Sequence, residues 1–199
     1  TPPVRNVNDL PSGELRLVGR QLQYETLRAD TSSVRDEDGV STLNYQWEIS
    51  NDGSTWQPYR SDDWSGDTVV LSQAVGRYVR VVISYTDGFG TRERIESAAS
   101  DPIKNVNDPV RGDIVVRGET LVGDTVRADT SQLSDRDGIA NVTLIWESSR
   151  DGQSWQRAAE SSVGELTLTN GVIGAQIRVR AVVVDRYGNE GTVISGNVG

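Results

Sequence analysis

Hydrophobic and polar residues alternate with a period of two in short stretches of the first half of the chain. Tyr45, Trp47 and Ile49 alternate with polar neighbours, and Val79–Tyr85 follows the same pattern. Such alternation predicts strands that bury one face of a sheet. Further short strands are predicted at residues 14–17, 27–29, near Trp56, and at 69–71 and 91–98. Turn-forming residues separate these stretches, and none shows the spacing of an amphipathic helix.

The pattern recurs because the chain contains two copies of one sequence unit. Asn6–Asp9 and Asn105–Asp108 read identically, and their offset is 99 residues (105 minus 6). The same offset relates Arg28–Ser32 to Arg127–Ser131 and carries the first Trp-Glu pair onto the second. A repeat of this length predicts tandem modules, which we place at residues 1–104 and 105–199.

The residues before the first copy match the end of that copy. Pro3-Val4-Arg5 lies at the same offset from Pro102-Ile103-Lys104. Residues 1–5 are therefore expected to be the tail of a preceding copy, and the chain a piece of a longer array. Seven short strands in about 100 residues, with a Trp in the third, are typical of a β-sandwich. The predicted fold is all-β: two tandem β-sandwich domains joined by a short linker.

Composition narrows the function classes. The net charge of the 199 residues is −9, and the chain contains neither His nor Cys. An acidic chain lacks the basic face that nucleic acids and anionic membranes require, and no apolar run reaches the length of a membrane span. Without His and Cys, the commonest general base and the thiol nucleophile are missing. No Gly-rich phosphate loop is present either. We expect no enzymatic activity.

Acidic residues gather in turns that a sandwich brings to one end. In each copy, the leading joint, the loop between the second and third strands, and the last turn should meet there, because successive strands run up and down. Carboxylates placed together repel each other, and a hard divalent cation such as Ca²⁺ removes that repulsion. The alternative is that these aspartates only cap turns. The predicted Ca²⁺ ligands at these ends are Asn8, Asp9, Asp36, Asp38, Asp87, Asn107, Asp108, Asp135, Asp137 and Asp185. Asp101 is a further predicted ligand, which the exit of the first copy should bring to the facing side of the joint.

The tryptophans are mostly expected to pack. Trp47 and Trp146 occupy the core position of the third strand, and Trp56 and Trp155 follow Asp-Gly turns at matching positions. Trp64 differs, because it follows Asp62 and Asp63 in a longer polar loop of the first copy. Asp62, Asp63 and Trp64 are an alternative ligand site, where the aromatic ring would stack on a sugar; the other interpretation is a Trp folded back on the sandwich.

Three motifs in one order resemble a known family. They are "NYQWEISNDGSTWQ", "SQAVGRYVRVVISYTDGFG" and the "VND" joint, and they resemble the immunoglobulin-like, cadherin-related repeats of large bacterial surface adhesins exported by type I secretion, many with RTX repeats. The resemblance implies that the two predicted sandwiches are tandem immunoglobulin-like Greek-key β-sandwich domains. It also implies an extracellular module at the bacterial cell surface. It implies a spacer that is stiffened by Ca²⁺ at domain junctions and projects a ligand-binding domain for cell adhesion or biofilm formation.

The resemblance also implies partners. Adjacent repeats of the same chain would be the neighbours, in a monomeric rod, and glycans or cell-surface proteins would be bound through other domains. The second copy departs from the pattern, because "VVVDRYGNE" stands where the first has "SYTDGFGTR". The two copies therefore need not bind ions equally. A carbohydrate- or protein-binding module and an accessory domain of a secreted enzyme remain the alternatives.

Overall fold

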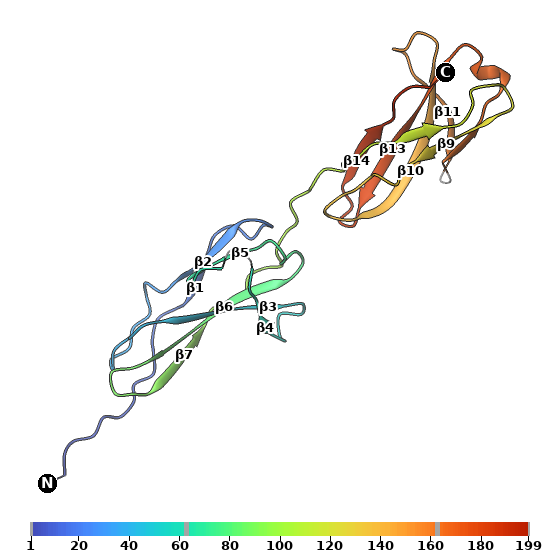
Figure 1. Cartoon of the computed structure of the whole chain (residues 1–199). Helices are drawn as coiled ribbons and strands as arrows, with labels where there is room; N and C mark the ends of the chain where they lie inside the picture. Colours follow the sequence, from blue (N-terminus) through green and yellow to red (C-terminus); the bar gives the residue numbers. More distant parts are fainter. Residues whose placement is uncertain (1, 62–63, 162–163, 199) are drawn as a thin grey trace. The chain divides into compact units, whose positions relative to one another are not determined.

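The computed structural model describes residues 2–61, 64–161 and 164–198. The chain forms two compact units, Thr1–Val106 (unit 1) and Asn107–Gly199 (unit 2), and each is described by itself. Both units are built from antiparallel strands in two sheets (Figure 1). The prediction of two immunoglobulin-like β-sandwich domains is confirmed. No helix among the described residues is long and apolar enough to cross a membrane.

Unit 1 pairs a three-stranded sheet of order β1-β2-β5 with a four-stranded sheet of order β4-β3-β6-β7. The central pair of the larger sheet is β3 with β6, where Asn44 lies opposite Ser84 at one end and Ser50 opposite Tyr78 at the other. The strands are β1 (Arg16–Val18), β2 (Thr26–Asp30), β3 (Asn44–Ser50), β4 (Gln57–Pro58), β5 (Thr68–Val70), β6 (Tyr78–Thr86) and β7 (Arg92–Glu96).

Unit 2 repeats this topology, with sheets of order β12-β9-β8 and β11-β10-β13-β14. Its central pair is β10 with β13, which runs from Ile139 opposite Asp185 to Ser149 opposite Gln176. A single 3₁₀ turn, η1 (Asn170–Val172), precedes β13. The strands are β8 (Val115–Arg117), β9 (Thr125–Asp129), β10 (Ile139–Ser149), β11 (Gln156–Ser161), β12 (Glu165–Thr167), β13 (Gln176–Asp185) and β14 (Glu190–Ile194).

Each core is centred on the Trp of the third strand. Trp47 and Trp146 are fully buried between the two sheets of their units. Around them lie the inward residues of the alternating stretches, for example Val79 and Val81 in unit 1 and Val179 in unit 2. The apolar positions of the period-two pattern therefore point toward the opposite sheet, as predicted. Their burial stabilises the packing of the two sheets.

On the outer face of each four-stranded sheet, an arginine stacks on a tryptophan ring. The Arg80 guanidinium lies 4.4 Å from the ring centroid of Trp56 and forms an ion pair with Glu48. In unit 2 Arg178 lies 4.0 Å from the ring centroid of Trp155 and pairs with Glu147. Trp56 and Trp155 thus pack under an arginine on the sheet surface and do not enter the core. The outward arginines thus pair with acids across neighbouring strands, as opposite charges on one face of a sheet commonly do.

The Asp-Gly turns after β3 and β10 are wider than the two-residue hairpin turn that an Asp-Gly dipeptide favours. Six residues separate β3 from β4, because β3 ends at Ser50 and β4 begins at Gln57. Asp52 closes this loop by accepting the N–H groups of Ser54 and Thr55 at 2.8 and 2.7 Å. Asp151 does the same for Gln153 and Ser154. A side-chain acceptor stabilises the loop here, where a two-residue turn would have used only the backbone.

The segment that leads into each unit is held against the loop before the third strand. Ser12 and Arg35 form an antiparallel bridge, and Arg111 and Ser134 form its equivalent. A Cβ on Gly112 would lie 2.0 Å from the carbonyl oxygen of Gln132, and the residue has φ +102°. Only glycine fits this approach. The leading segment is thereby placed beside the acidic loop.

The two tryptophans of unit 2 allow a matched stability test. Trp146→Ala is expected to lower the free energy of unfolding of unit 2 by about 3–5 kcal/mol, because it opens a cavity in the core. Trp155→Ala is expected to cost about 1 kcal/mol, the usual contribution of a cation–π contact at a surface. Urea unfolding followed by circular dichroism measures both. Equal losses would contradict the assignment of one Trp to the core and the other to the sheet surface.

The Asp151 turn predicts a pH dependence. The N–H groups of Ser154 and Gln153 hold the pKa of Asp151 well below its usual range. A carboxyl whose pKa is lower in the folded state stabilises that state above its unfolded pKa of about 3.9, and this contribution is lost as the pH falls further. Asp151→Asn is expected to be less stable than the parent chain at neutral pH and to lose less stability between neutral pH and acid. Urea midpoints at several pH values provide the measurement; parallel curves would contradict it.

Candidate metal centre

Three carboxylates of unit 2 meet at the end of the sandwich where β13 stops. Asp135 and Asp137 come from the loop between β9 and β10, and Asp185 is the last residue of β13. One carboxylate oxygen of each lies within 4.8 Å of the others, and this is the one such group of three among the described residues. Asp137 and Asp185 are only 6% and 3% exposed. The sequence predicted all three as ligands, and the fold brings them together.

The loop backbone holds these carboxylates in place. Asp135 Oδ1 accepts the N–H of Asp137 at 2.8 Å. Asp185 Oδ1 accepts the N–H groups of Tyr187 and Asn189, and its Oδ2 accepts the Asn189 side-chain amide at 2.8 Å. Burial alone would raise the pKa of Asp185, but the hydrogen bonds from Asn189 and Tyr187 outweigh it, and the pKa lies below its ordinary value. Asp185 is therefore ionised at neutral pH.

The segment that leads into unit 2 is tied to this group. The N–H of Asp108 donates to Asp137 Oδ2 at 2.8 Å. Beside it lies a hollow of about 160 Å³, whose lining includes Asn107, Asp108, Asp135 and Glu190. A water molecule occupies about 30 Å³ in the liquid, so the hollow has room for about five waters. Predicted ligands from the leading segment and the loop thus line one hollow.

The donor set fits a calcium ion. Ca²⁺ binds six to eight oxygens at 2.3–2.6 Å, so two of its ligands lie at most about 5 Å apart. The 4.8 Å limit within Asp135, Asp137 and Asp185 satisfies this condition. Zinc and copper prefer nitrogen and sulfur ligands, and the chain has no His or Cys. Each aspartate already accepts an N–H bond, so turn capping and ion binding are compatible uses of the same side chains.

Unit 1 gathers more acid at the equivalent end. Asp38 Oδ2 accepts the N–H of Asp9 at 2.9 Å, as Asp137 does for Asp108. Asp36 Oδ2 accepts the Tyr85 hydroxyl at 2.6 Å, and Asn8 donates its side-chain amide to Glu93 at 2.9 Å. Most of the predicted set of this unit, namely Asn8, Asp9, Asp36, Asp38 and Asp87, therefore belongs to one end of the sandwich.

Asp87 has an oxygen that the protein leaves unsatisfied. Its Oδ1 accepts the N–H groups of Phe89 and Thr91, whereas its Oδ2 is buried with no hydrogen-bond partner among the described residues. A buried carboxylate oxygen without a partner is costly unless a cation or water meets it. Burial would raise the pKa of Asp87, but the N–H groups of Thr91 and Phe89 lower it below its ordinary value. This carboxylate oxygen is therefore available to a cation or to a water molecule.

The pKa of the Tyr85 hydroxyl reflects the negative charge at this end of unit 1. Burial, the hydrogen bond to Asp36 and the nearby charges of Asp36, Glu93 and Asp87 together raise the pKa of its hydroxyl far above the ordinary value. The hydroxyl therefore stays protonated and donates to Asp36. The equivalent position in unit 2 is Val183, since Tyr85 lies opposite Glu93 and Val183 lies opposite Gly191.

Basic residues make the acidic ends of the two units chemically different. Arg186 follows Asp185 and lies against Gly138, whereas Gly88 follows Asp87. Arg136 approaches Asp108 to 4.0 Å, whereas Glu37 occupies the equivalent position in unit 1. Val110 lies against Gly191, where unit 1 has a buried Glu93. In unit 2 the three carboxylates thus lie close to one another, and arginines partly neutralise their charge. The acidic end of unit 1 has a larger excess of negative charge.

Two predicted site elements lie apart from these groups. Asp101 is exposed at the other end of unit 1, where its N–H is bonded by Gln21 Oε1. Trp64 is 43% exposed, with the Arg60 guanidinium 5.8 Å from its ring centroid. Asp62 and Asp63, the carboxylates of the alternative sugar site, lie outside the described residues. The Trp64 site therefore stays a prediction.

Sequence reasoning missed Glu93, Tyr85 and Asn189. Glu93 carried a detectable signal, because it shares the inward face of β7 with Ile95, a position where a charged residue is unusual. Asn189 follows Asp185 by four residues and acts through a local turn that periodicity does not reveal.

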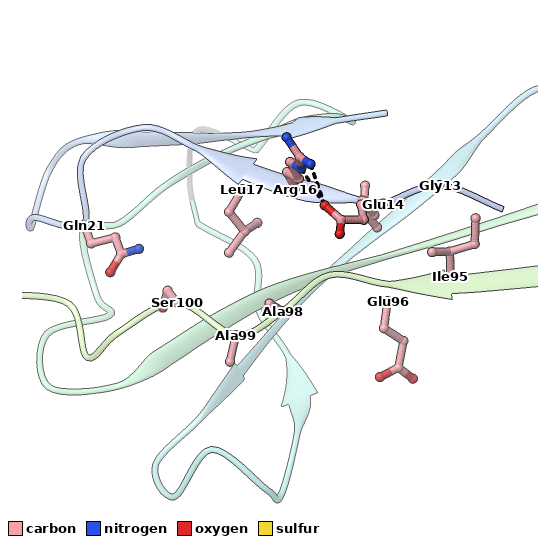
Figure 2. Close-up of a pocket in the computed structure, with 11 residues that line it drawn as sticks. Gly13, Glu14, Arg16, Leu17, Gln21, Ile95, Glu96, Ala98, Ala99 and Ser100 are labelled. Carbon is pink, nitrogen blue, oxygen red and sulfur yellow. Dashed lines mark hydrogen bonds and ion pairs between the residues drawn. The ribbon is translucent and has the colours of Figure 1, made fainter. Parts of the chain in front are cut away.

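A larger hollow of about 530 Å³ in unit 1 lies between β1 and the β7 side of the sandwich (Figure 2). Its charged residues Glu14 and Arg16 pair with each other at 2.6 Å, and small residues such as Ala98 and Ala99 line the rest. No residue of the predicted metal set lines it. This hollow therefore lacks the group of carboxylates that makes the end of unit 2 a candidate metal centre.

Comparison with known proteins gives distant structural likenesses. No family model matches the chain, and no curated protein matches it. The chain is similar to the chicken CNTN1 FN1–FN3 domains, with 14% identity and a TM-score of 0.35, over 94% of this chain and 65% of that chain. It is similar to a tetra-tandem repeat in the extending region of a large adhesion protein, with 14% identity and a TM-score of 0.35, over 96% of this chain and 50% of that one.

A cytokine receptor complex also matches, with 14% identity and a TM-score of 0.30, over 92% of each chain. The chain spans less than two thirds of the length of the first two structures. At these values the likenesses concern the fold and carry no functional argument.

Proposed function

We propose that the chain is a pair of calcium-binding spacer modules from an extracellular adhesion protein, and that its role is mechanical and non-enzymatic. The observation that carries the proposal is the group formed by Asp135, Asp137 and Asp185, with the leading segment tied to it through Asp108. Its counterpart in unit 1 includes the unsatisfied oxygen of Asp87. Both groups consist of hard oxygen donors, which suit Ca²⁺.

The proposed mechanism is linkage between ion binding and order. An ion that binds only the folded arrangement stabilises that arrangement. Asp108 and Asn107 belong to the segment that leads into unit 2, and Asn8 and Asp9 to the one that leads into unit 1. Binding of Ca²⁺ would fix these segments to their loops and reduce the freedom of the chain between repeats. A stiffened repeat is what a spacer that projects a distant binding domain requires.

The finer features of the proposal rest on the sequence motifs. Tandem repetition, an acidic surface and the lack of Cys suit an array of similar modules, each of which mainly contacts its neighbours. Export by type I secretion, location on the bacterial surface and a role in cell adhesion or biofilm formation are part of the same proposal. Ligands such as glycans or cell-surface proteins would be bound by other domains of the parent protein.

Calcium is expected to raise the melting temperature of the chelator-treated chain. At free Ca²⁺ about 100-fold above the dissociation constant, the stabilisation is about 2.7 kcal/mol for each site. For domains of this size, that corresponds to a shift of about 10 °C or more. Mg²⁺ should give a smaller shift, because it requires regular octahedral geometry and gives up its waters reluctantly. Differential scanning and titration calorimetry provide the measurements; neither heat nor a shift with Ca²⁺ would refute the proposal.

A matched pair of Asp→Asn substitutions locates the site in unit 2. Asp137→Asn removes one charge from the group without changing the size of the side chain, and is expected to weaken calcium binding by unit 2 about tenfold or more. Asp151→Asn is the control, because Asp151 follows the other end of the 11-residue strand β10, roughly 30 Å away. It should leave calcium affinity unchanged. Calorimetric titration of both variants tests this, and equal affinities would place the ion elsewhere.

A further inference from the structure

The turn that precedes β13 contains a chemically reactive dipeptide. Asn170-Gly171 is the one Asn-Gly pair of the chain. In such a pair the glycine nitrogen can attack the side-chain carbonyl carbon of the residue before it, because glycine has no Cβ to hinder the approach. The same attack is open to Asp-Gly pairs, and the chain has five of them: Asp38-Gly39, Asp52-Gly53, Asp87-Gly88, Asp137-Gly138 and Asp151-Gly152. The fold determines which of these pairs can react.

Hydrogen bonds occupy the glycine nitrogen of every Asp-Gly pair. A nitrogen whose N–H is hydrogen-bonded keeps its proton and its direction, so it is a poor nucleophile. Three of these N–H groups donate to backbone carbonyls, namely Gly39 to Asp36 at 3.1 Å, Gly88 to Asp38 at 2.9 Å and Gly138 to Asp135 at 3.0 Å. The other two donate to serine hydroxyls, Gly53 to Ser50 at 2.9 Å and Gly152 to Ser149 at 3.0 Å.

The carboxyl groups of these pairs are also poor targets. An ionised carboxylate repels a nucleophile, whereas a neutral amide does not. The N–H groups of Thr55 and Ser54 hold the pKa of Asp52 well below its usual range. The equivalent turn of unit 2 does the same for the pKa of Asp151. The Asp-Gly turns are therefore protected at both reacting atoms.

The Asn-Gly pair lacks this protection. Gly171 lies in η1, which Figure 1 draws as a short coiled ribbon. Its N–H has no hydrogen-bond partner among the described residues, and Thr169 makes no side-chain cap at the start of the turn. Asn170 is exposed, and Gly171 lines a hollow of about 330 Å³ together with Ser149 and Asp151, so water reaches the pair.

The corresponding turn of unit 1 differs in sequence and in capping. It reads Leu71-Ser72-Gln73-Ala74, where unit 2 has Leu168-Thr169-Asn170-Gly171. The Tyr59 hydroxyl accepts the Gln73 N–H at 3.4 Å, whereas the position of Tyr59 is taken in unit 2 by Ala158, which has no side-chain acceptor. Gln73 is exposed although Ile103 packs on the same end of unit 1. Exposure of this turn is therefore a property of the sandwich and does not depend on the chain that follows.

We propose that Asn170 is a site of spontaneous deamidation, which gives unit 2 a negative charge that unit 1 does not acquire. The Gly171 nitrogen loses its proton to hydroxide and bonds to Asn170 Cγ. The bond between Cγ and the amide nitrogen breaks, and ammonia leaves. Water then opens the resulting five-membered succinimide ring. Attack at Cγ gives aspartate, and attack at the main-chain carbonyl gives isoaspartate, in which the chain continues through the side chain. Water is the only co-reactant, and nothing is oxidised or reduced.

The turn is weak enough to allow ring closure and small enough to change without unfolding the unit. The Ile173 N–H donates to the Asn170 carbonyl at 3.3 Å, a long bond in a single 3₁₀ turn, so local opening lets the nitrogen reach Cγ. In isoaspartate this bond is lost, because the main chain gains a carbon atom at residue 170. No residue of η1 is buried, so the core of unit 2 stays intact. The reaction involves no metal ion, which separates it from calcium binding.

Mass spectrometry of the folded chain, incubated at mildly alkaline pH with Ca²⁺ and with chelator, tests the proposal. The intact mass is expected to rise by the difference between an OH and an NH₂ group in both solutions, and peptide mapping should place the change at residue 170. Gly171→Ala is the matched variant, since its Cβ would lie 3.6 Å from Thr169 Oγ1, an ordinary contact that leaves the turn unstrained. It is expected to slow the conversion about tenfold or more, because the Cβ hinders ring closure.

Two further comparisons separate the fold from the sequence. The five Asp-Gly pairs should stay unchanged in the folded chain and form isoaspartate in guanidinium chloride, where their hydrogen bonds are lost. Asn170→Gln should keep its amide, because its longer side chain would have to close a six-membered ring. A folded parent chain that keeps the Asn170 amide during an incubation that converts a peptide of sequence LTNGVIG would overturn the proposal. So would conversion at residue 170 that Gly171→Ala leaves equally fast.

Discussion

Ionised carboxylates concentrated at one end of a sandwich repel each other, and each unit must compensate that repulsion. The loops do part of this with backbone N–H groups: Asp38 and Asp137 each hold the leading segment, and Asp87 and Asp185 each close the last turn. These donors lower the pKa values of Asp87 and Asp185 and keep them charged. The bonds therefore fix the loops and at the same time preserve the charge that attracts a cation.

The two units compensate the remaining charge differently. Unit 2 places Arg136 and Arg186 near its carboxylates, whereas unit 1 has Glu37 and Gly88 at those positions and adds a buried Glu93. Tyr85 donates a hydrogen bond to Asp36 but brings no positive charge. If both units bind Ca²⁺ as proposed, unit 1 would therefore gain more stability from the ion than unit 2. Two repeats of one sequence unit would then differ in their dependence on calcium while keeping the same fold.

The fold could be predicted from the sequence because period-two alternation and the 99-residue repeat are properties of many residues at once. The convergence of Asp135, Asp137 and Asp185 followed from topology, since alternating strands bring those loops to one end. Details that depend on local geometry could not be predicted from the sequence. The turn at Asp52 is wider than its Asp-Gly dipeptide suggests, because the carboxylate and not the backbone closes it. Trp56 and Trp155 pack beneath arginines that neither spacing nor composition identifies.

The opposite end of each sandwich follows a different physical rule. In unit 1, the end near Ser50 and Tyr78 is closed by Ile103, an aliphatic side chain supplied by residues that already belong to the joint. A few residues further along the chain lies Asp108, the equivalent of Asp9, whose N–H donates to Asp137 in the acidic loop of unit 2. A single joint therefore carries two signals in sequence: an aliphatic side chain, that of Ile103, which completes the core behind it, and a backbone N–H, that of Asp108, which binds the acidic loop ahead of it. Each half of the joint thus acts on a different sandwich, and the joint is repeated as a unit: five of the seven residues of Pro102–Asp108 are identical in Pro3–Asp9.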